Sequence, residues 1–410
     1  GKDPILLIIL LNYMISYLKK VAHEFLAGYM FVCMFNFYFS DSTSADREHN
    51  EPGPTLPDDQ KFFIQRNNVP IGFEVYKDKV FVTVPRRRYG IPSTINFIPL
   101  GSAPHLKPYP DVASVGQFVS VYRPRVDVCG RLWMVDTGLL EVPGARRQVR
   151  PPAIIIYDLK TDRQILKHEL NPSVLINERT TGGLTSITVD VDQNACDDAY
   201  AYINDLATEG LVVFSLRQRA SWRVDHPSFR HDEAAVNFTS SGQLINWKDG
   251  LFSIALAERG CRRQLVYHPL VSTQEFAVDS TLIRDFLYLF KLLGTRGSNT
   301  QSGSHDYHSP TSTMFYANVA QAGILCWNVN TDVTPDNFVL VAKDEDKMGY
   351  ISDLKVKGND VWFLSNQIPK FVFNTQDIND FNYFIMSNAL CKQLLRMVKI
   401  RGTPVATNHA

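Results

Sequence analysis

Apolar residues along this chain occur in short runs, and the runs come in pairs separated by a turn. In each pair the second run has an aromatic or β-branched centre and stops at a polar residue or a proline. This pattern is typical of β-strands, whereas stretches with a helical period are scarce. The best helical candidate, Arg284 to Leu293, fits an outer strand leading into a loop equally well. The sequence therefore predicts an all-β protein.

The paired unit recurs six times along the chain. The second runs are VFVTVP (Val80 to Pro85), LWMVD (Leu132 to Asp136), AYIND (Ala201 to Asp205), LVYHP (Leu265 to Pro269), MFYAN (Met314 to Asn318) and VWFLS (Val361 to Ser365). Aligned on their centres, they lie 51, 69, 64, 49 and 47 residues apart. A strand unit of about fifty residues with irregular insertions is typical of propeller blades. We expect a six-bladed β-propeller with a central channel over residues 67–400, followed by a tail at 401–410.

Composition narrows the function classes. The chain has 410 residues, 45% of them apolar, which is enough for a large core. It carries 42 basic and 42 acidic residues, so no overall charge directs it to nucleic acid or to a membrane surface. Asn237 begins the sequon Asn-Phe-Thr, an acceptor for N-glycosylation in exported proteins.

The first 45 residues differ from the rest. Two apolar runs, residues 5–18 and 25–39, are separated by Lys19 and Lys20. Read from Met14, a basic stretch, an apolar stretch and small residues ending at Ala45 predict a secretory signal peptide cleaved near Ala45. A membrane anchor is the alternative, although the first run is short for a membrane span. We expect a leader at 1–45, a linker at 46–66 and a secreted, extracellular propeller without stable membrane insertion after cleavage.

Five cysteines follow the leader. Cys129, Cys196 and Cys261 each fall in the turn between the two runs of a unit. Turns of neighbouring blades lie close together on one face, so we pair Cys129 with Cys196. Cys326 and Cys391 are expected to tie the last blades to the C-terminal tail, which leaves Cys261 as a possible free thiol.

The ends of the second runs are the candidate ligand site. In a blade the first strand lines the channel, and the second strand runs antiparallel to it. The starts of first strands and the ends of second strands therefore lie around the same channel mouth, where ligands commonly bind. The polar ends are Asp136, Asp205, Asn318 and Ser365, with Pro85 and Pro269 at the other two. Such groups suit an amine and hydroxyl groups, and Tyr316, Tyr350 and Ile368 are apolar neighbours for a ring. The alternative is that these polar residues only end strands.

Other constellations are weaker, and no standard catalytic signature occurs. His305 to His308 contain metal-like residue types in a segment rich in Gly and Ser. Glu74, Asn204 and Asp353 are candidate calcium ligands in the channel, as in a lactonase-type propeller. We interpret Arg86 to Arg88 as a solvated turn. Our expectation is a protein without bound metal or cofactor.

Several segments resemble the insect yellow and major royal jelly proteins, and the yellow type most closely. They are NNVPIGFEVYKDKVFVTVPRRRYGIPSTINFI from Asn67, CGRLWMVDTG from Cys129, CDDAYAYIND from Cys196, LVYHPLVSTQEFAV from Leu265, CWN from Cys326 and VWFLSNQIP from Val361. The resemblance covers residues from about Asn67 to Cys391 in the family's order. It implies a secreted six-bladed propeller and supports both cysteine pairs.

The resemblance also implies a ligand class. Family members act in cuticle pigmentation and melanin formation, some convert dopachrome, and salivary relatives bind biogenic amines at the channel mouth. An indole or catechol ring that bears an amine or carboxylate is therefore the implied ligand. The nearest local match to the amine-binding pocket is Leu364 to Asn366 together with Ile351 and Ser352. This adds Ser352 and Asn366 to the candidate ligand-binding residues Asp136, Asp205, Asn318, Ser365 and Ile368.

Three functions follow as hypotheses. The first is a secreted pigmentation protein that binds a small indole or catechol derivative. If it is an enzyme, it converts dopachrome, with Asp136 or Asp205 as the acid–base group and Asn318 or Asn366 stabilising the oxyanion. The second is a non-catalytic protein that binds biogenic amines or acts in signalling. The third is a calcium-dependent hydrolase. Because a closed propeller exposes few sheet edges, we expect a monomer.

Overall fold

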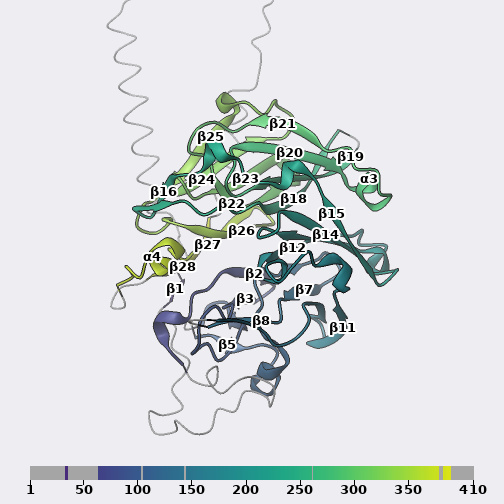
Figure 1. Ribbon diagram of the computed structural model, residues 1–410, viewed down its shortest axis with the longest axis vertical. Helices are drawn as coiled ribbons and strands as arrows, with labels where there is room; N and C mark the ends of the chain where they lie inside the picture. Colours follow the sequence, from purple (N-terminus) through teal and green to yellow (C-terminus); the bar gives the residue numbers. More distant parts are fainter. Residues whose placement is uncertain are drawn as a thin grey trace, which may run out of the picture.

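The computed structural model describes residues 33–35, 63–102, 105–142, 145–260, 262–377 and 382–388. In this part of the chain six four-stranded antiparallel sheets form the blades of a propeller, and two short hairpins extend from it (Figure 1). First strands such as β2, β12, β22 and β26 lie towards the centre in Figure 1, and outer strands such as β11 and β21 lie at the periphery. The predicted all-β, six-bladed fold is confirmed.

The blades follow one another along the chain. Their strands are β2 (Gly72–Tyr76), β3 (Lys79–Thr83), β4 (Ile95–Pro99) and β5 (Lys107–Pro108) in blade one; β6 (Arg125–Val126), β7 (Arg131–Asp136), β10 (Ala153–Asp158) and β11 (Arg163–Glu169) in blade two; and β12 (Leu184–Asp190), β13 (Tyr200–Asp205), β14 (Gly210–Ser215) and β15 (Ala220–Asp225) in blade three. Blade four contains β18 (Leu251–Arg259), β19 (Arg262–Pro269), β20 (Gln274–Asp279) and β21 (Lys291–Thr295); blade five contains β22 (Ser302–His308), β23 (Thr313–Asn318), β24 (Gly323–Asn328) and β25 (Phe338–Lys343); blade six contains β26 (Ile351–Lys357), β27 (Asp360–Ser365), β28 (Tyr383–Asn388) and β1 (Cys33–Phe35).

Short elements connect the blades. They are the hairpins β8 (Leu139–Val142) with β9 (Ala145–Gln148) and β16 (Phe238–Ser240) with β17 (Gln243–Ile245), the helices α2 (Thr180–Gly183), α3 (Ser280–Arg284) and α4 (Ile368–Val372), and 3-10 turns that include η2 (Gln65–Asn67), η6 (Pro227–Phe229) and η7 (Glu233–Ala235). Of the helical candidate at 284–293, Arg284 ends α3, residues 285–290 form a loop and residues 291–293 begin the outer strand β21. Within the described ranges, none of the helices has the length and hydropathy of a membrane span.

The core consists of apolar layers between neighbouring blades. Trp133 and Ile154 of blade two, for example, pack against Ile187, Ala201 and Val212 of blade three. Second strands are buried on both faces, and every residue of β7 is buried. The outer strand β11 is instead largely exposed, and its sequence is charged. This gradient explains why second strands give the clearest apolar pattern in the sequence.

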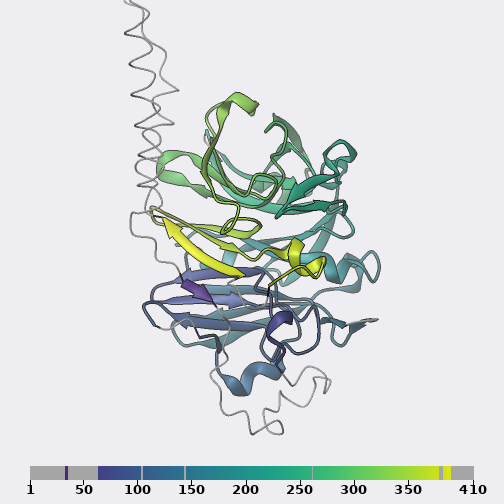
Figure 2. The same ribbon diagram turned by 90° about the vertical axis from the view of Figure 1, so that its left-hand side faces the viewer.

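Blade six closes the ring by combining both ends of the described chain. β1 pairs with β28, so a purple strand lies beside the yellow strands in Figure 2. β1 belongs to the predicted leader, most of which lies outside the described residues, and a chain cleaved near Ala45 lacks this strand. The leader boundary stays a prediction. The predicted tail also lies outside the described residues.

Ion pairs fill the channel away from its mouth. Arg125 of blade two contacts both carboxylate oxygens of Asp306 in blade five, at 2.9 and 3.0 Å. Lys357 lies 2.7 Å from Glu74, and Lys355 lies 3.1 Å from Asp353. The two carboxylates proposed as calcium ligands are therefore each paired with a lysine, which does not favour the calcium alternative.

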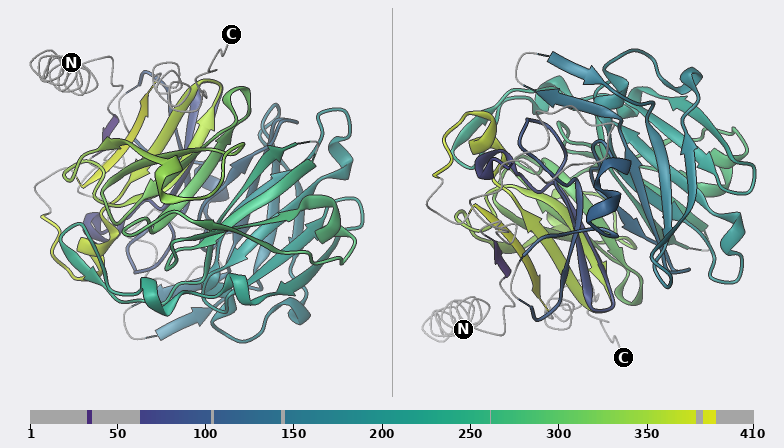
Figure 3. Two further views of the ribbon diagram at one scale, coloured as in Figure 1. Left: turned by 90° about the horizontal axis from the view of Figure 1, so that it is seen from above. Right: turned by 90° about the horizontal axis from the view of Figure 1, so that it is seen from below.

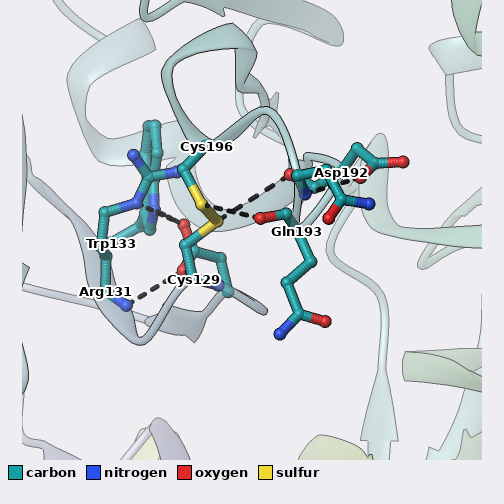
Figure 4. The surroundings of a disulfide bond; sticks show 8 residues. Cys129, Arg131, Trp133, Asp192, Gln193 and Cys196 are labelled. Carbon is teal, nitrogen blue, oxygen red and sulfur yellow. Dashed lines mark hydrogen bonds and ion pairs between the residues drawn. A yellow bond between two sulfur atoms is a disulfide. The ribbon is translucent and has the colours of Figure 1, made fainter.

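A disulfide joins blades two and three at the turns between their first and second strands (Figure 4). Cys129 and Cys196 have Cα atoms 6.0 Å apart and are separated by 67 residues in sequence. The predicted pair is confirmed. Cys326 is buried in β24, whereas Cys391 and Cys261 lie outside the described residues, so the second pair and the state of Cys261 stay predictions.

The opposite face carries the channel mouth and the large insertions. In the left view of Figure 3, η2, the blue hairpin β8–β9, the teal segment with β16 and β17, and the yellow helix α4 lie along the same edge of the molecule. The insertion between blades three and four reaches across this face. Ser240 donates to the Gly349 carbonyl at 3.2 Å, and Gln301 donates to the Ala235 carbonyl at 2.9 Å. Asn237 is exposed on this insertion, as a glycosylation site requires.

Candidate functional site

A cluster of charged and aromatic side chains gathers where the blades meet the channel mouth. We define the mouth cluster as Arg87, Arg123, Arg179, Asp249, Phe252 and Tyr350. Arg123, Asp249 and Tyr350 come directly before the first strands of blades two, four and six, and Arg179 comes before α2 and the first strand of blade three. Arg87 follows the second strand of blade one. Antiparallel blades bring all of these positions to one face.

Asp249 is the titratable group at the centre of this cluster. It interacts electrostatically with Arg87, Arg123 and Arg179, yet its carboxylate accepts no hydrogen bond from the described residues. Burial raises the pKa of Asp249 to about 6, against the opposing effect of the three arginines. A carboxylate that is partly buried and titrates near neutral pH is suited to accept and return a proton.

Arg123 is held rigidly at the channel wall. Its Nε donates to the Ser352 carbonyl at 2.7 Å and its Nη1 donates to the Thr185 carbonyl at 3.2 Å. The guanidinium lies over the Phe252 ring, 4.5 Å from the centroid. Burial lowers the pKa of Arg123, but an arginine stays charged near neutral pH. The site therefore contains a fixed cation beside an aromatic face.

Tyr350 contributes a hydroxyl donor. Its ring is buried. Its backbone carbonyl accepts a hydrogen bond from Ser365 Oγ at 3.2 Å and another from the backbone N–H of Asn366 at 3.0 Å. Burial raises the pKa of Tyr350, so the phenol stays protonated at neutral pH. The hydroxyl makes no hydrogen bond to the described residues and interacts electrostatically with Arg123 and Asp249.

Three of the predicted ligand residues anchor turns. Asp136 accepts from the amides of Val119, Ser120 and Gly138 at 2.7, 2.8 and 3.1 Å. Asp205 accepts from the amides of Ala207 and Thr208 and from Arg223 at 2.9 Å. Asn318 accepts from the amides of Ala320 and Gln321, both at 3.0 Å, and donates to the Asn299 carbonyl. These side chains are buried, and their polar atoms stabilise the turns after the second strands.

The other predicted residues lie next to the mouth cluster and support it. Ser352 donates to the Ile71 carbonyl at 2.9 Å, and its own carbonyl holds Arg123. Asn366 donates to the Pro70 carbonyl at 2.8 Å. Ile368 packs in the same apolar cluster as Tyr350 and Phe252. Whether any of them contacts a ligand stays a prediction.

A second polar cluster is buried between blades four and five. His268, Glu275 and His305 could offer three ligand atoms within 4.8 Å of one another. Arg296, however, already forms an ion pair with Glu275. A divalent cation would therefore add two uncompensated charges to a fully buried site, at a large desolvation cost. Burial lowers the pKa of both histidines, that of His305 to about 3, so they are neutral core residues at neutral pH.

Sequence reasoning missed the arginines and Asp249. It examined the ends of second strands but not the residues just before the first strands, although both positions reach the same mouth. The interpretation of Arg86 to Arg88 as a solvated turn was wrong. Arg86 is fully buried and donates to the carbonyls of Ile91, Phe118 and Val119. The Arg88 guanidinium lies 4.0 Å from the centroid of the Phe371 ring.

Comparisons with known proteins agree with the fold and the sequence motifs. A family model described as "Major royal jelly protein" matches residues 119–399. "L-dopachrome tautomerase yellow-f" of Drosophila melanogaster is 40% identical over 345 residues, covering 79% of this chain and 80% of that protein. "Dopaminechrome tautomerase" of the same organism is 32% identical and covers 79% of this chain and 75% of that protein. "Protein yellow" of Drosophila melanogaster is 33% identical and covers 80% of this chain and 64% of that protein. The chain therefore belongs to the yellow and major royal jelly protein family.

Proposed function

We propose that this protein is an extracellular tautomerase of melanin formation that acts on an aminochrome, the indoline quinone formed from a catechol amine. Two relatives that align over most of the chain are named tautomerases of dopachrome and dopaminechrome. The observation that carries the proposal is Asp249, a mouth carboxylate with a pKa of about 6 and no hydrogen-bond donor among the described residues. The role proposed from sequence for Asp136 or Asp205 moves to Asp249, because those two carboxylates anchor turns.

The reaction needs one base and one stabilising group. The Asp249 carboxylate removes a proton from the ring carbon beside the nitrogen. The electron pair of that C–H bond moves through the conjugated ring to a quinone oxygen, which takes up a proton from water, and Asp249 then releases to water the proton that it removed. The product is an isomer, so no oxidant or reductant takes part. Arg123 stabilises the developing oxyanion, and the Tyr350 hydroxyl donates to it.

Amine binding without turnover is the second candidate. An apolar ring can lie against Phe252, and Asp249 can attract an ammonium group. The three arginines oppose a cationic ligand, however, and the raised pKa of Asp249 has no role in simple sequestration. We therefore place this candidate second.

The test is conversion of dopachrome by the purified protein, corrected for the reaction without protein. We expect Asp249→Asn to lower kcat at least about 100-fold, the usual scale of acid–base catalysis, with an unchanged Tm. Asp232→Asn is the matched control, because Asp232 only caps η7 on the same insertion and asparagine keeps that cap. Loss of activity in Asp232→Asn as well, or full activity in Asp249→Asn, contradicts the proposal.

A further inference from the structure

Several arginines act electrostatically on Asp249. Asp249 is the one carboxylate of the mouth cluster, and Arg87, Arg123 and Arg179 all interact with it. His231 also interacts with Asp249 but is bound by Glu209 at 2.6 Å and Glu233 at 3.1 Å. Three arginines therefore act on a single carboxylate of the mouth cluster, although Arg123 also interacts with Asp353 in the channel.

Two of the arginines retain hydrogen-bonding capacity for a ligand. Arg123 uses Nε and Nη1 for protein carbonyls, whereas its Nη2 makes no hydrogen bond to the described residues. Arg179 is exposed, and its guanidinium has no hydrogen-bond or ion-pair partner among the described residues. Arg123 faces the developing oxyanion of the proposed reaction, so the exposed Arg179 guanidinium is the one that suits a carboxylate, which arginine binds through charge-assisted hydrogen bonds.

Aminochromes differ in the substituent on the carbon beside the ring nitrogen, which is the group that these arginines would bind. Dopachrome carries a carboxylate on the carbon beside the ring nitrogen, and dopaminechrome carries only hydrogen there. We propose that the mouth arginines select the carboxylated aminochrome, with Arg179 as the specificity-determining residue, and that they exclude cationic amines. This inference rests on the proposed tautomerase function and names its substrate class. A carboxylate on the reacting carbon also places the proton to be removed near Asp249.

Binding of three stable probes measures the preference without turnover. Indole-2-carboxylate, indole and tryptamine share one ring system and carry a negative charge, no charge and a positive charge. By calorimetric titration we expect indole-2-carboxylate to bind at least about 10-fold more tightly than the other two, and more weakly as salt rises. Equal or tighter binding of tryptamine, or equal binding of indole, overturns the inference.

Variants locate the preference. Arg179→Gln removes an exposed charge without disturbing a packed contact, and we expect it to reduce the preference for indole-2-carboxylate about 10-fold. Arg217→Gln is the control, since Arg217 is also exposed but pairs with Asp198 at the opposite end of the blades, where the turns between first and second strands lie. An unchanged preference in Arg179→Gln, or an equal loss in Arg217→Gln, overturns the assignment.

Turnover on the same preparations separates this inference from the proposed function. If the protein converts dopachrome and dopaminechrome with equal kcat/KM, the carboxylate inference fails and the tautomerase proposal stands. If the protein prefers indole-2-carboxylate but converts neither aminochrome, the tautomerase proposal fails and the mouth is an anion-binding site. Faster conversion of dopachrome, lost selectively in Arg179→Gln, supports both.

Discussion

Asp249 and Asp205 show how the surroundings of a carboxylate decide its role. Asp205 is buried among donors, and Arg223, whose side chain is 6% exposed, depends on it for an ion pair. Asp249 lies among the same kind of cations without a hydrogen bond from the described residues. The surroundings of Asp205 make its carboxylate stabilise a turn, whereas the surroundings of Asp249 leave its carboxylate able to accept a proton near neutral pH.

Asp205→Asn is therefore expected to affect folding rather than chemistry. The change leaves Arg223 buried without its main partner, at a cost of about 3 kcal/mol in the free energy of unfolding, measured by urea denaturation. Asp225→Asn is the control, because Asp225 also contacts Arg223 at 2.7 Å but is exposed. A stable Asp205→Asn protein that has lost dopachrome conversion would restore Asp205 as the catalytic carboxylate.

His305 predicts a pH dependence of stability. An imidazole in the unfolded chain has a pKa of about 6.5, whereas burial, with His268 and Arg296 nearby, lowers the pKa of His305 to about 3. The unfolded chain then binds more protons, so His305 lowers stability progressively as the pH falls from about 6.5 towards 3. His305→Gln keeps partners for Ser253 and the Val266 carbonyl. We expect the free energy of unfolding of His305→Gln to fall less steeply than that of the parent protein as the pH is lowered. Parallel pH dependences of the two proteins would contradict this prediction.

Elements with a strict burial pattern could be predicted from sequence, and elements defined by long-range contacts could not. The second strands are apolar throughout because both faces are buried, and Cys129 and Cys196 lie in turns whose place follows from those strands. The end residues Asp136 and Asn318 were found, but turn anchoring and ligand binding use the same residue types. Arg123 has no local signal, since its role arises from Ser352, 229 positions away in sequence.

The disulfide between the turns of blades two and three carries an element-scale prediction. It closes a loop of 67 residues, which in the chain-entropy account stabilises the fold by about 4 kcal/mol. We expect the double variant Cys129→Ser/Cys196→Ser to lose about that much in urea denaturation. Reduction should destabilise the parent protein by at least a similar amount, whereas in the double variant it can act only on the predicted pair of Cys326 with Cys391. A double variant as stable as the parent protein would contradict the prediction.

At the scale of the whole molecule, one ion pair spans the channel. Arg125 and Asp306 come from blades two and five, and the Asp306 side chain is 6% exposed. Burial acts in the opposite direction, but Arg125 holds the pKa of Asp306 below its usual value. Asp306→Asn should cost about 3–5 kcal/mol in unfolding free energy because it leaves Arg125 unpaired. The double variant Arg125→Met/Asp306→Leu should recover much of the loss, and strictly additive effects would contradict a cross-channel pair.

The molecule therefore combines a channel closed by ion pairs with a mouth that holds one titratable carboxylate among arginines. The most direct test of this account is the pH dependence of kcat/KM for dopachrome conversion, in the parent protein and in Asp249→Asn. We predict that the parent activity rises with pH through an apparent pKa of about 6, as Asp249 loses its proton. The rise should be absent in Asp249→Asn. The same rise in Asp249→Asn, at comparable activity, would show that another group carries the proton and would contradict the account.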